Sequence, residues 1–221
     1  MKVESRESRV EGQSPKAAGS GPLLILISAP SGGGKTTLCQ QLLAARPDMT
    51  RAITCTTRAP RPGEKDGVDY YFFSAVDFQR RVAAGEFIEH ATVFGCSYGI
   101  LRSELVNKLR SGRDILLNVD VQGAATIRQR AQREPELKGA LVTVFLTPPS
   151  IRVLQERLQK RASENPVEIQ QRLDIAREEI AQWKKFDYLL ISLSVQEDLR
   201  RMLAIVEAEK MRAARSQAPE S

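Results

Sequence analysis

Cysteine is scarce in this chain, and the three cysteines present cannot form a compact metal or disulfide site. Cys39, Cys55 and Cys96 lie far apart in the sequence, and no C-x-x-C pair occurs. This usage is typical of a reduced intracellular protein without structural zinc. Long apolar runs are also lacking: none approaches the ~20 residues that span a membrane, and the N-terminus is unlike a signal peptide. We therefore expect a cytoplasmic protein with no membrane association.

Long tracts of a single charge are absent as well. The formal net charge is +6 and the pI is about 9.4, but acidic residues are interspersed with basic ones along the chain. A nucleic-acid partner is disfavoured, because there is neither a long Lys/Arg tract nor a basic–aromatic ladder. An enzyme that handles phosphate groups needs only a few well-placed arginines. A solvated surface of mixed charge accounts for most of the remaining excess.

The two ends of the chain have little apolar material to bury. Residues 1–20 are mostly small, polar or charged, and residues 212–221 have a similar composition. Such segments cannot offset the entropy lost on ordering, so we predict a disordered N-terminal lead and a flexible C-terminal tail. Residues 21–211 are long enough for one domain with a full core.

Glycine is concentrated in one stretch, which contains the strongest short motif of the sequence. The stretch reads Ala29-Pro30-Ser31-Gly32-Gly33-Gly34-Lys35-Thr36-Thr37. It follows an apolar run at 23–27 and leads into a segment with apolar residues at helical spacing. A strand, a glycine-rich turn, Gly-Lys-Thr and a helix are the context that a P-loop requires. Backbone N–H groups of such a turn surround phosphate oxygens, and the helix N-terminus adds positive partial charge.

The motif therefore predicts binding of a nucleoside triphosphate. Lys35 would reach the β and γ phosphates, and the Thr36 hydroxyl would coordinate Mg²⁺. Ala29 stands where the general motif has its first glycine, and alanine can replace it as long as φ stays negative. The alternative is a glycine-rich turn that merely happens to precede Lys-Thr, and the flanking strand and helix disfavour it.

Apolar runs predict buried strands at about 23–27, 52–55, 115–119, 141–146 and 188–191. Helical spacing predicts helices at about 36–46, 101–111, 122–132, 149–160 and 195–211. Continuous apolarity indicates strands covered on both faces, as in a parallel sheet. We therefore predict an α/β fold: a parallel sheet flanked by helices, with the P-loop at the carboxyl end of its first strand.

Two segments fall outside this alternation, and we expect both to be insertions. Residues 53–103 are rich in Thr, Arg, Gly, Tyr and Phe, and their short alternating runs predict a small antiparallel, β-rich unit. Residues 152–182 read as a helix–loop–helix with a polar tip at 161–164, and Asn165 and Glu168 can cap its second helix. An arginine-rich loop over a P-loop core is typical of a lid. The core then consists of 22–52, 104–151 and 183–211.

Further motifs lie beyond the P-loop. They read TCTTRAPRPGE at 54–64, GVDY at 67–70, EFIE at 86–89, YG at 98–99 and DVQG at 120–123. Together, from about 22 to 210, they resemble guanylate kinase, a P-loop nucleoside monophosphate kinase. The resemblance implies transfer of the γ-phosphate of ATP to GMP and dGMP, with Mg²⁺ as cofactor, in purine nucleotide metabolism. It also implies that 53–103 is the GMP-binding region, that 152–182 is the lid, and that residues 29–37 bind ATP.

Four residues would hold the GMP phosphate. Arg58 and Arg61, three positions apart and flanked by prolines, can bind a phosphate bidentately. Tyr70 and Tyr98 correspond to phosphate-binding tyrosines of the family. The alternative for these two tyrosines is simple packing of a small sheet, and the surrounding motif favours the functional interpretation.

Glu89 corresponds to the family's guanine-reading carboxylate. Guanine offers N1–H and N2–H₂ as adjacent donors, and a carboxylate accepts both. Adenine would leave the carboxylate unpaired, a mismatch worth about 10⁴-fold in discrimination. Thr54, Glu64 and Asn118 correspond to further positions of the GMP pocket.

The lid and the metal complete the implied site. Arg157 corresponds to an ATP-binding arginine, and Arg161 and Arg172 would bridge the phosphates of both substrates and stabilise the transferring group. The implied catalytic residues are Lys35, Arg58, Arg161 and Arg172. Asp120 would join Thr36 in the Mg²⁺ shell, directly or through water. No general base is required for this transfer, and we take the lone histidine, His90, as a surface or pocket-wall residue.

The sequence departs from the family at four places around the bases. Ile100 stands where Ser or Thr is usual, and Asn118 replaces an acidic residue. Ser192-Leu193 replaces Asn-Asp beside the adenine, and Cys96-Ser97 replaces Asn-Tyr before Tyr98. Each loss is worth about 1–3 kcal/mol if it leaves a buried group unpaired. The choice of base is the property these changes put in question.

Two alternatives to the GMP kinase remain open. One is a related P-loop kinase that acts on another small phosphate ester. The other is a catalytically weakened guanylate-kinase-like module that binds a protein. The intact Gly34-Lys35-Thr36, the arginines and Asp120 argue against the binding module, and we expect no obligatory protein partner.

Overall fold

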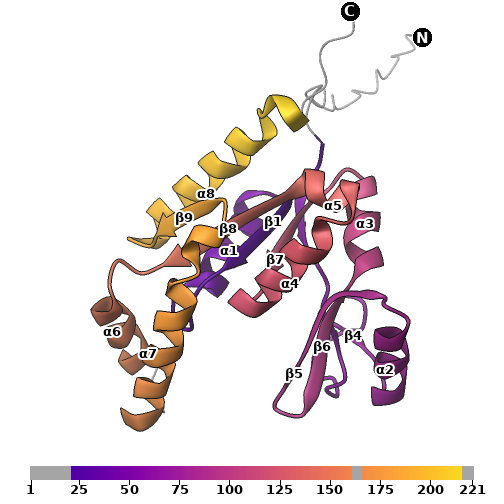
Figure 1. The fold of residues 1–221 in the computed structure, drawn as a ribbon, viewed down its shortest axis with the longest axis horizontal. Coiled ribbons are helices and arrows are strands. Elements are labelled where there is room, and N and C mark those ends of the chain that lie inside the picture. The colour runs from indigo at the N-terminus through magenta and orange to yellow at the C-terminus, as the bar shows by residue number, and fades with distance from the viewer. Residues whose placement is uncertain (1–20, 161–165, 216–221) are drawn as a thin grey trace, which may run out of the picture.

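The computed structural model describes residues 21–160 and 166–215 of the chain. The predicted lead at 1–20, the segment 161–165 with Arg161, and residues 216–221 lie outside this part. None of the helices described is long and apolar enough to cross a bilayer, and the cytoplasmic location stays a prediction. Figure 1 shows a central sheet flanked by helices, with two appendages that project to the same side of it.

A five-stranded parallel sheet forms the centre of the molecule, in the order β2-β7-β1-β8-β9. Its strands are β1 (Leu24–Ser28), β2 (Met49–Arg51), β7 (Asp114–Asn118), β8 (Leu141–Thr147) and β9 (Tyr188–Ile191). The middle strand, β1, is buried along its whole length. A strand covered on both faces needs an unbroken apolar run. The predicted α/β fold is confirmed.

Five helices cover the two faces of this sheet: α1 (Lys35–Ala45), α3 (Arg102–Arg110), α4 (Val121–Ala131), α5 (Pro135–Ala140) and α8 (Val195–Lys210). Leu24 and Leu26 pack in one hydrophobic layer with α3, α4 and α5. Ile25 and Ile27 pack in a second layer with α1 and α8. Successive side chains of a strand point to opposite faces, so one apolar run supplies both layers.

The first appendage is a small sheet of four strands in the order β4-β3-β6-β5. Its elements are β3 (Cys55–Thr56), β4 (Tyr71–Phe72), α2 (Ala75–Ala83), β5 (Phe87–Val93) and β6 (Cys96–Leu101). The β3–β6 and β5–β6 pairs are antiparallel as predicted, but β4 runs parallel to β3. The connection between β3 and β4 is long enough to bring the chain back in the same direction. Helix α2 was not predicted, because Phe78 is its only buried residue.

The second appendage is the helix–loop–helix predicted to be the lid, and we keep that name for it; it consists of α6 (Ile151–Lys160) and α7 (Pro166–Ile180). Leu158 of α6 packs with Leu173 and Ala176 of α7 in a core separate from both layers of the sheet. A short 3₁₀ helix, η1 (Trp183–Lys185), returns the chain to β9. The lid is therefore a small body with its own packing, beside the edge of the sheet where the parallel strands end (Figure 1).

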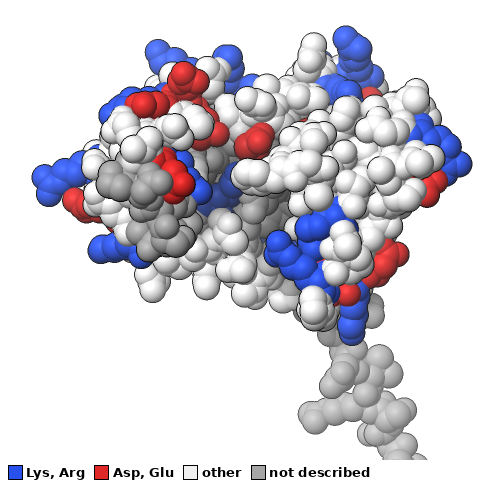
Figure 2. All heavy atoms as spheres, turned by 90° about the horizontal axis from the view of Figure 1, so that it is seen from below, with Lys and Arg blue, Asp and Glu red and all other residues white. Residues whose placement is uncertain are grey.

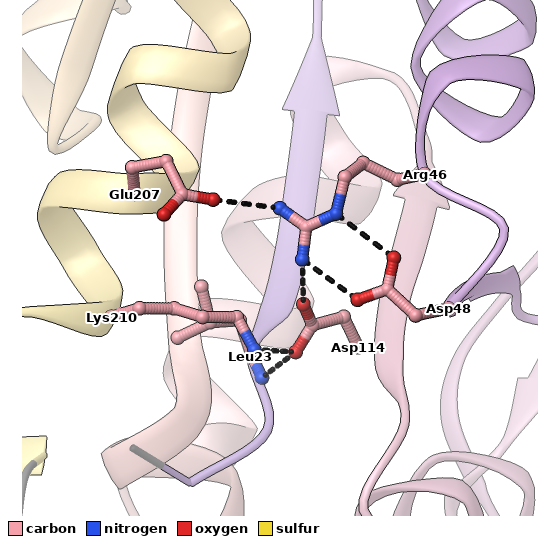
Figure 3. A network of polar contacts seen from close by, with 6 residues as sticks. All are labelled: Leu23, Arg46, Asp48, Asp114, Glu207 and Lys210. Carbon is pink, nitrogen blue, oxygen red and sulfur yellow. Dashed lines mark hydrogen bonds and ion pairs between the residues drawn. The ribbon is translucent and has the colours of Figure 1, made fainter. Parts of the chain in front are cut away.

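The opposite edge of the sheet holds an ion-pair network around one buried carboxylate (Figure 3). Asp114, at the start of β7, accepts from the Leu23 amide and from Lys210 Nζ, both at 2.9 Å. Its second oxygen lies 3.4 Å from Arg46 Nη2, and Arg46 also binds Asp48 and Glu207. The network joins α1, β7 and α8 around one carboxylate.

The end of the described chain is docked rather than loose. Residues 212–215 belong to the predicted flexible tail, but Ala213–Arg215 form a 3₁₀ helix, η2. Arg215 donates to the carbonyls of Gly139 and Leu141 and pairs with the buried Glu209. The composition of 212–221 could not predict these contacts, because the carboxylate that pairs with Arg215 lies on α8.

One predicted strand is misplaced. The apolar run at 52–55 was expected to form a single strand of the central sheet. The chain instead forms β2 before this run and β3 at its end, and the two strands belong to different sheets. Residues 52–54 cross from one sheet to the other. Apolar content is similar in a crossing segment and in a buried strand, so periodicity could not separate them.

Candidate active site

The P-loop connects β1 to α1, and its backbone conformation depends on two glycines. Gly32 and Gly34 have φ of 81° and 97°, which L side chains rarely adopt. A Cβ on Gly32 would lie 2.9 Å from Leu158 Cδ2, so the loop also packs directly against the lid. Gly34 caps α1 without any side-chain hydrogen bond. The amide donors of this helix start are therefore available to an anion.

The loop encloses a cavity of about 340 Å³. Its walls are Ala29, Pro30, Ser31, Gly32, Gly33, Gly34, Lys35, Thr36, Asp120 and Glu179. Lys35 Nζ donates to the Val119 carbonyl at 2.8 Å. Burial lowers the pKa of Lys35, and the nearby Asp120, Cys39 and Glu179 oppose this shift in that order. A partly buried ammonium that donates to one carbonyl and lines a cavity is suited to a phosphate ligand.

Asp120 follows β7 and caps α4. Its Oδ1 accepts from the Gly123 amide at 2.7 Å, which fixes the carboxylate at the mouth of the P-loop cavity. Thr36 lines the same cavity. A carboxylate and a hydroxyl are oxygen donors of the kind that Mg²⁺ prefers, and Mg²⁺ needs only one or two such ligands beside phosphates and water. These two residues fit the metal.

On the other side of the P-loop, a second cavity of about 380 Å³ lies between the lid and the start of α8. Arg157 reaches across it, with its guanidinium 3.3 Å from Ser192 Oγ and 3.4 Å from the Gly33 carbonyl. Ser192 Oγ donates to Asp198 at 2.7 Å. Asp198 was not singled out in the sequence, since nothing distinguishes it from other acids of α8 until the fold brings it beneath Ser192.

Three of the four residues predicted to hold the GMP phosphate form one cluster: Arg58, Tyr70 and Tyr98. Arg58 makes two hydrogen bonds to Glu64, at 2.8 and 3.0 Å, and lies over the Tyr70 ring at 5.3 Å. The Tyr70 and Tyr98 rings are 6.5 Å apart. Glu64 raises the pKa of Arg58, and a contact with Tyr98 adds to the effect. Glu64 also accepts from the Arg61 backbone amide at 2.7 Å, so it orients the Arg58 side chain and fixes the backbone at Arg61.

Glu89 lies in the middle of β5, opposite Ile100 in the register with β6. Burial, with a contribution from Asp120, raises its pKa to about 7. A Cβ placed on Gly123 would lie 3.5 Å from its carboxyl carbon, so Glu89 sits close to the start of α4. Arg130 opposes this shift, but no ion pair to Glu89 occurs among the described residues, and a half-buried carboxylate of this kind is suited to accept from a ligand.

Thr54 and Asn118 line a third cavity of about 280 Å³, together with Tyr70, Ile100 and Thr36. Thr36 is therefore shared between this cavity and the P-loop cavity. Ile100 is only 4% exposed and packs in the core beside Ile88.

Helix α7 of the lid adds two further side chains near the P-loop. Arg172 Nη1 lies 3.5 Å from Ser31 Oγ. Glu179 lines the P-loop cavity, and sequence reasoning missed it. The available signal was its spacing of seven residues from Arg172, which puts both on one helix face. Arg161 lies outside the described residues. Figure 2, which looks at the molecule from below, shows a hollow between the two appendages with Lys and Arg atoms in it.

Comparison with known proteins agrees with this geometry. Residues 22–209 match the guanylate kinase family. A guanylate kinase of Coxiella burnetii is 42% identical over 188 residues, which cover 85% of this chain and 88% of the relative. One from Alcanivorax borkumensis is 43% identical over 192 residues, covering 87% and 89%. The crystal structure of guanylate kinase from Anaplasma phagocytophilum has a TM-score of 0.67 at 32% identity, covering 89% of this chain and 90% of that chain. The chain therefore belongs to the guanylate kinase family.

Proposed function

We propose that the chain transfers the γ-phosphate of ATP to GMP and dGMP, giving ADP and the nucleoside diphosphate. The observation that carries this proposal is the position of Thr36. It is a wall of the P-loop cavity and a wall of the cavity lined by Thr54 and Tyr70. The cavity proposed for the ATP phosphates and a cavity that holds three predicted GMP-binding residues thus meet at one residue, which supports direct transfer.

ATP binds along the P-loop with its base toward the Arg157 cavity. The amides at the start of α1 receive the phosphates, and Lys35 exchanges the Val119 carbonyl for a phosphate oxygen. Arg157 already bridges the P-loop and Ser192, which supports a role between the phosphates and the base. Arg172 approaches the transferring group from the lid, and the sequence predicts the same role for Arg161, which lies outside the described residues.

Mg²⁺ would be held by Thr36 and Asp120, directly or through water. When bound, it neutralises charge on the phosphate oxygens. Asp120 is kept in place for this role by its cap on α4.

GMP binds to the small sheet. Arg58, oriented by Glu64, donates to its phosphate together with Arg61, Tyr70 and Tyr98. Ionised Glu89 accepts from the guanine N1–H and N2–H₂ groups. With both substrates bound, the reaction needs alignment and charge stabilisation and no general base.

The deciding experiment is ADP release with Mg·ATP against a panel of GMP, dGMP, AMP, UMP and CMP. We expect fast turnover with GMP and dGMP alone. Fast turnover with several bases would mean that Ile100 and Asn118 have altered the pocket, and would favour a kinase for another phosphate ester. No turnover with any nucleotide would favour the binding module.

A further inference from the structure

Helix α7 presents two opposite charges to the phosphate-binding cavity. Arg172 and Glu179 are two helical turns apart on one face. Arg172 reaches Ser31 at the start of the P-loop, and Glu179 forms part of the cavity wall. An arginine here suits a phosphate ligand. A carboxylate repels phosphate, so its presence requires another explanation.

The Glu179 carboxylate is incompletely satisfied. Its Oε2 atom is buried and has no hydrogen-bond partner among the described residues. Burial raises the pKa of Glu179, while Lys35 and the Ser31 amide lower it and Asp120 raises it further. Lys35 donates to the Val119 carbonyl instead of bonding Glu179. A buried acceptor in this condition is unfavourable until a donor or a cation reaches it.

Hydrated Mg²⁺ has the required chemistry. This ion usually keeps several of its waters and is held by one or two carboxylates together with substrate phosphates. Metal-bound waters donate hydrogen bonds, and a donor is what Glu179 Oε2 lacks. Asp120, Thr36 and Glu179 all line the same cavity, so the metal that fits the first two residues lies within reach of the third through water.

We propose that Glu179 is a positioning residue which accepts hydrogen bonds from water on ATP-bound Mg²⁺ and thereby makes the lid select Mg·ATP over metal-free ATP. The inference rests on the proposed function, because it takes ATP at the P-loop as given. Glu179 repels a bare triphosphate, whereas the metal replaces this repulsion with attraction. Since α7 carries both Glu179 and Arg172, metal binding also favours the lid position in which Arg172 meets the phosphates.

The test is Glu179→Gln, which keeps the shape of the side chain and removes its charge. Binding of the non-hydrolysable ATP analogue AMP-PNP is measured by calorimetry in EDTA. Binding of Mn²⁺ to the enzyme–AMP-PNP complex is measured by electron paramagnetic resonance. We expect the variant to bind metal-free AMP-PNP about tenfold more tightly than the unaltered enzyme and to bind Mn²⁺ about tenfold more weakly. A purely structural role would weaken both.

Glu178→Gln is the matched control, because Glu178 is the neighbouring, exposed acid of the same helix. It removes the same charge from the lid and should change neither affinity. Unchanged Mn²⁺ affinity in Glu179→Gln, or weaker binding of AMP-PNP in EDTA, would overturn the inference. Failure of the unaltered chain to bind AMP-PNP under any condition would instead overturn the proposed function itself.

Discussion

The two edges of the central sheet differ in how completely their buried charged groups are paired. At the amino edge, Asp114 is 2% exposed, and its two oxygens are fully paired with Leu23, Arg46 and Lys210 (Figure 3). At the carboxyl edge, within the part of the chain that the structure describes, Lys35 donates to one carbonyl and the buried Oε2 of Glu179 has no hydrogen-bond partner.

The difference separates structural from functional charge. A buried charge that the chain neutralises by itself contributes to the folded state and offers nothing to a ligand. A buried charge left incomplete costs stability until a ligand completes it, and such sites are where substrates bind. The same sheet therefore provides an internal control: changes at one edge should alter stability, and changes at the other edge should alter binding and turnover.

The largest effect is expected at the carboxyl edge, from Lys35→Ala. Loss of the ammonium removes charge stabilisation from the transferring phosphate, so kcat should fall about 10³-fold or more. Thermal stability should not fall, because the variant no longer buries a partly satisfied cation. Steady-state kinetics and a thermal melt check both parts. A folded variant with turnover near that of the unaltered chain would remove the P-loop lysine from the mechanism.

At the amino edge, Asp114→Asn should destabilise the fold by about 3 kcal/mol, because it leaves Lys210 and Arg46 facing a neutral group. The KM values for both nucleotides should stay the same. Urea unfolding measures the loss, and Asp77→Asn, which breaks an exposed ion pair on α2, should cost no more than about 0.5 kcal/mol. A change in KM without a change in stability would contradict the assignment of this edge to structure.

GMP affinity should depend on pH through Glu89, whose pKa is raised to about 7. The ionised carboxylate is the form that accepts from guanine, so affinity is full above this pKa and is lost as the pH falls below it. Between pH 8 and pH 6 the Kd should rise about tenfold. The GMP phosphate also titrates near pH 6, so calorimetry is compared with Glu89→Gln. A pH dependence identical in both proteins would exclude Glu89.

The smallest effect is expected from Ile100→Thr. A hydroxyl beside the base pocket can restore one hydrogen bond, which should lower the Kd for GMP about threefold. Ile100→Val controls for lost volume, since it removes a similar amount of packing and adds no donor. Ile100 is almost fully buried, so both variants should lose some stability. Equal GMP affinities in the two variants would mean that position 100 does not face the ligand.

Much of the fold could be predicted because single segments carry the information. The run at 23–27 is apolar throughout because both faces of β1 are covered. The P-loop is a local backbone structure that depends on residues adjacent in the sequence. The crossing of 52–54 from the central sheet to the small sheet was not predicted, and neither was the short helix α2. In each case the outcome depends on packing against strands distant in the sequence.

The site residues also divide into those that local sequence predicts and those that depend on distant packing. Arg58, Glu64 and Tyr70 lie close together in the sequence, and the structure brings them into one cluster as the motif suggested. Glu179 and Asp198 were not singled out, and the only signal for either was the seven-residue spacing of Glu179 from Arg172. Each is one of several acids on its helix, and only the packing of that helix against the P-loop or β9 decides which acid faces the site.

The docking of Arg215 has a consequence for the connectivity of the chain. The Gly21 amide donates to the Arg215 carbonyl at 3.3 Å, so the first and last described residues of the domain are adjacent. A short linker from residue 215 to residue 21 would permit a circular permutant with new ends in the turn at Phe94-Gly95. Phe94 is fully exposed there, and no hydrophobic layer would be cut. The order of the segments along the chain would change, while the phosphate cavity would be built from the same residues.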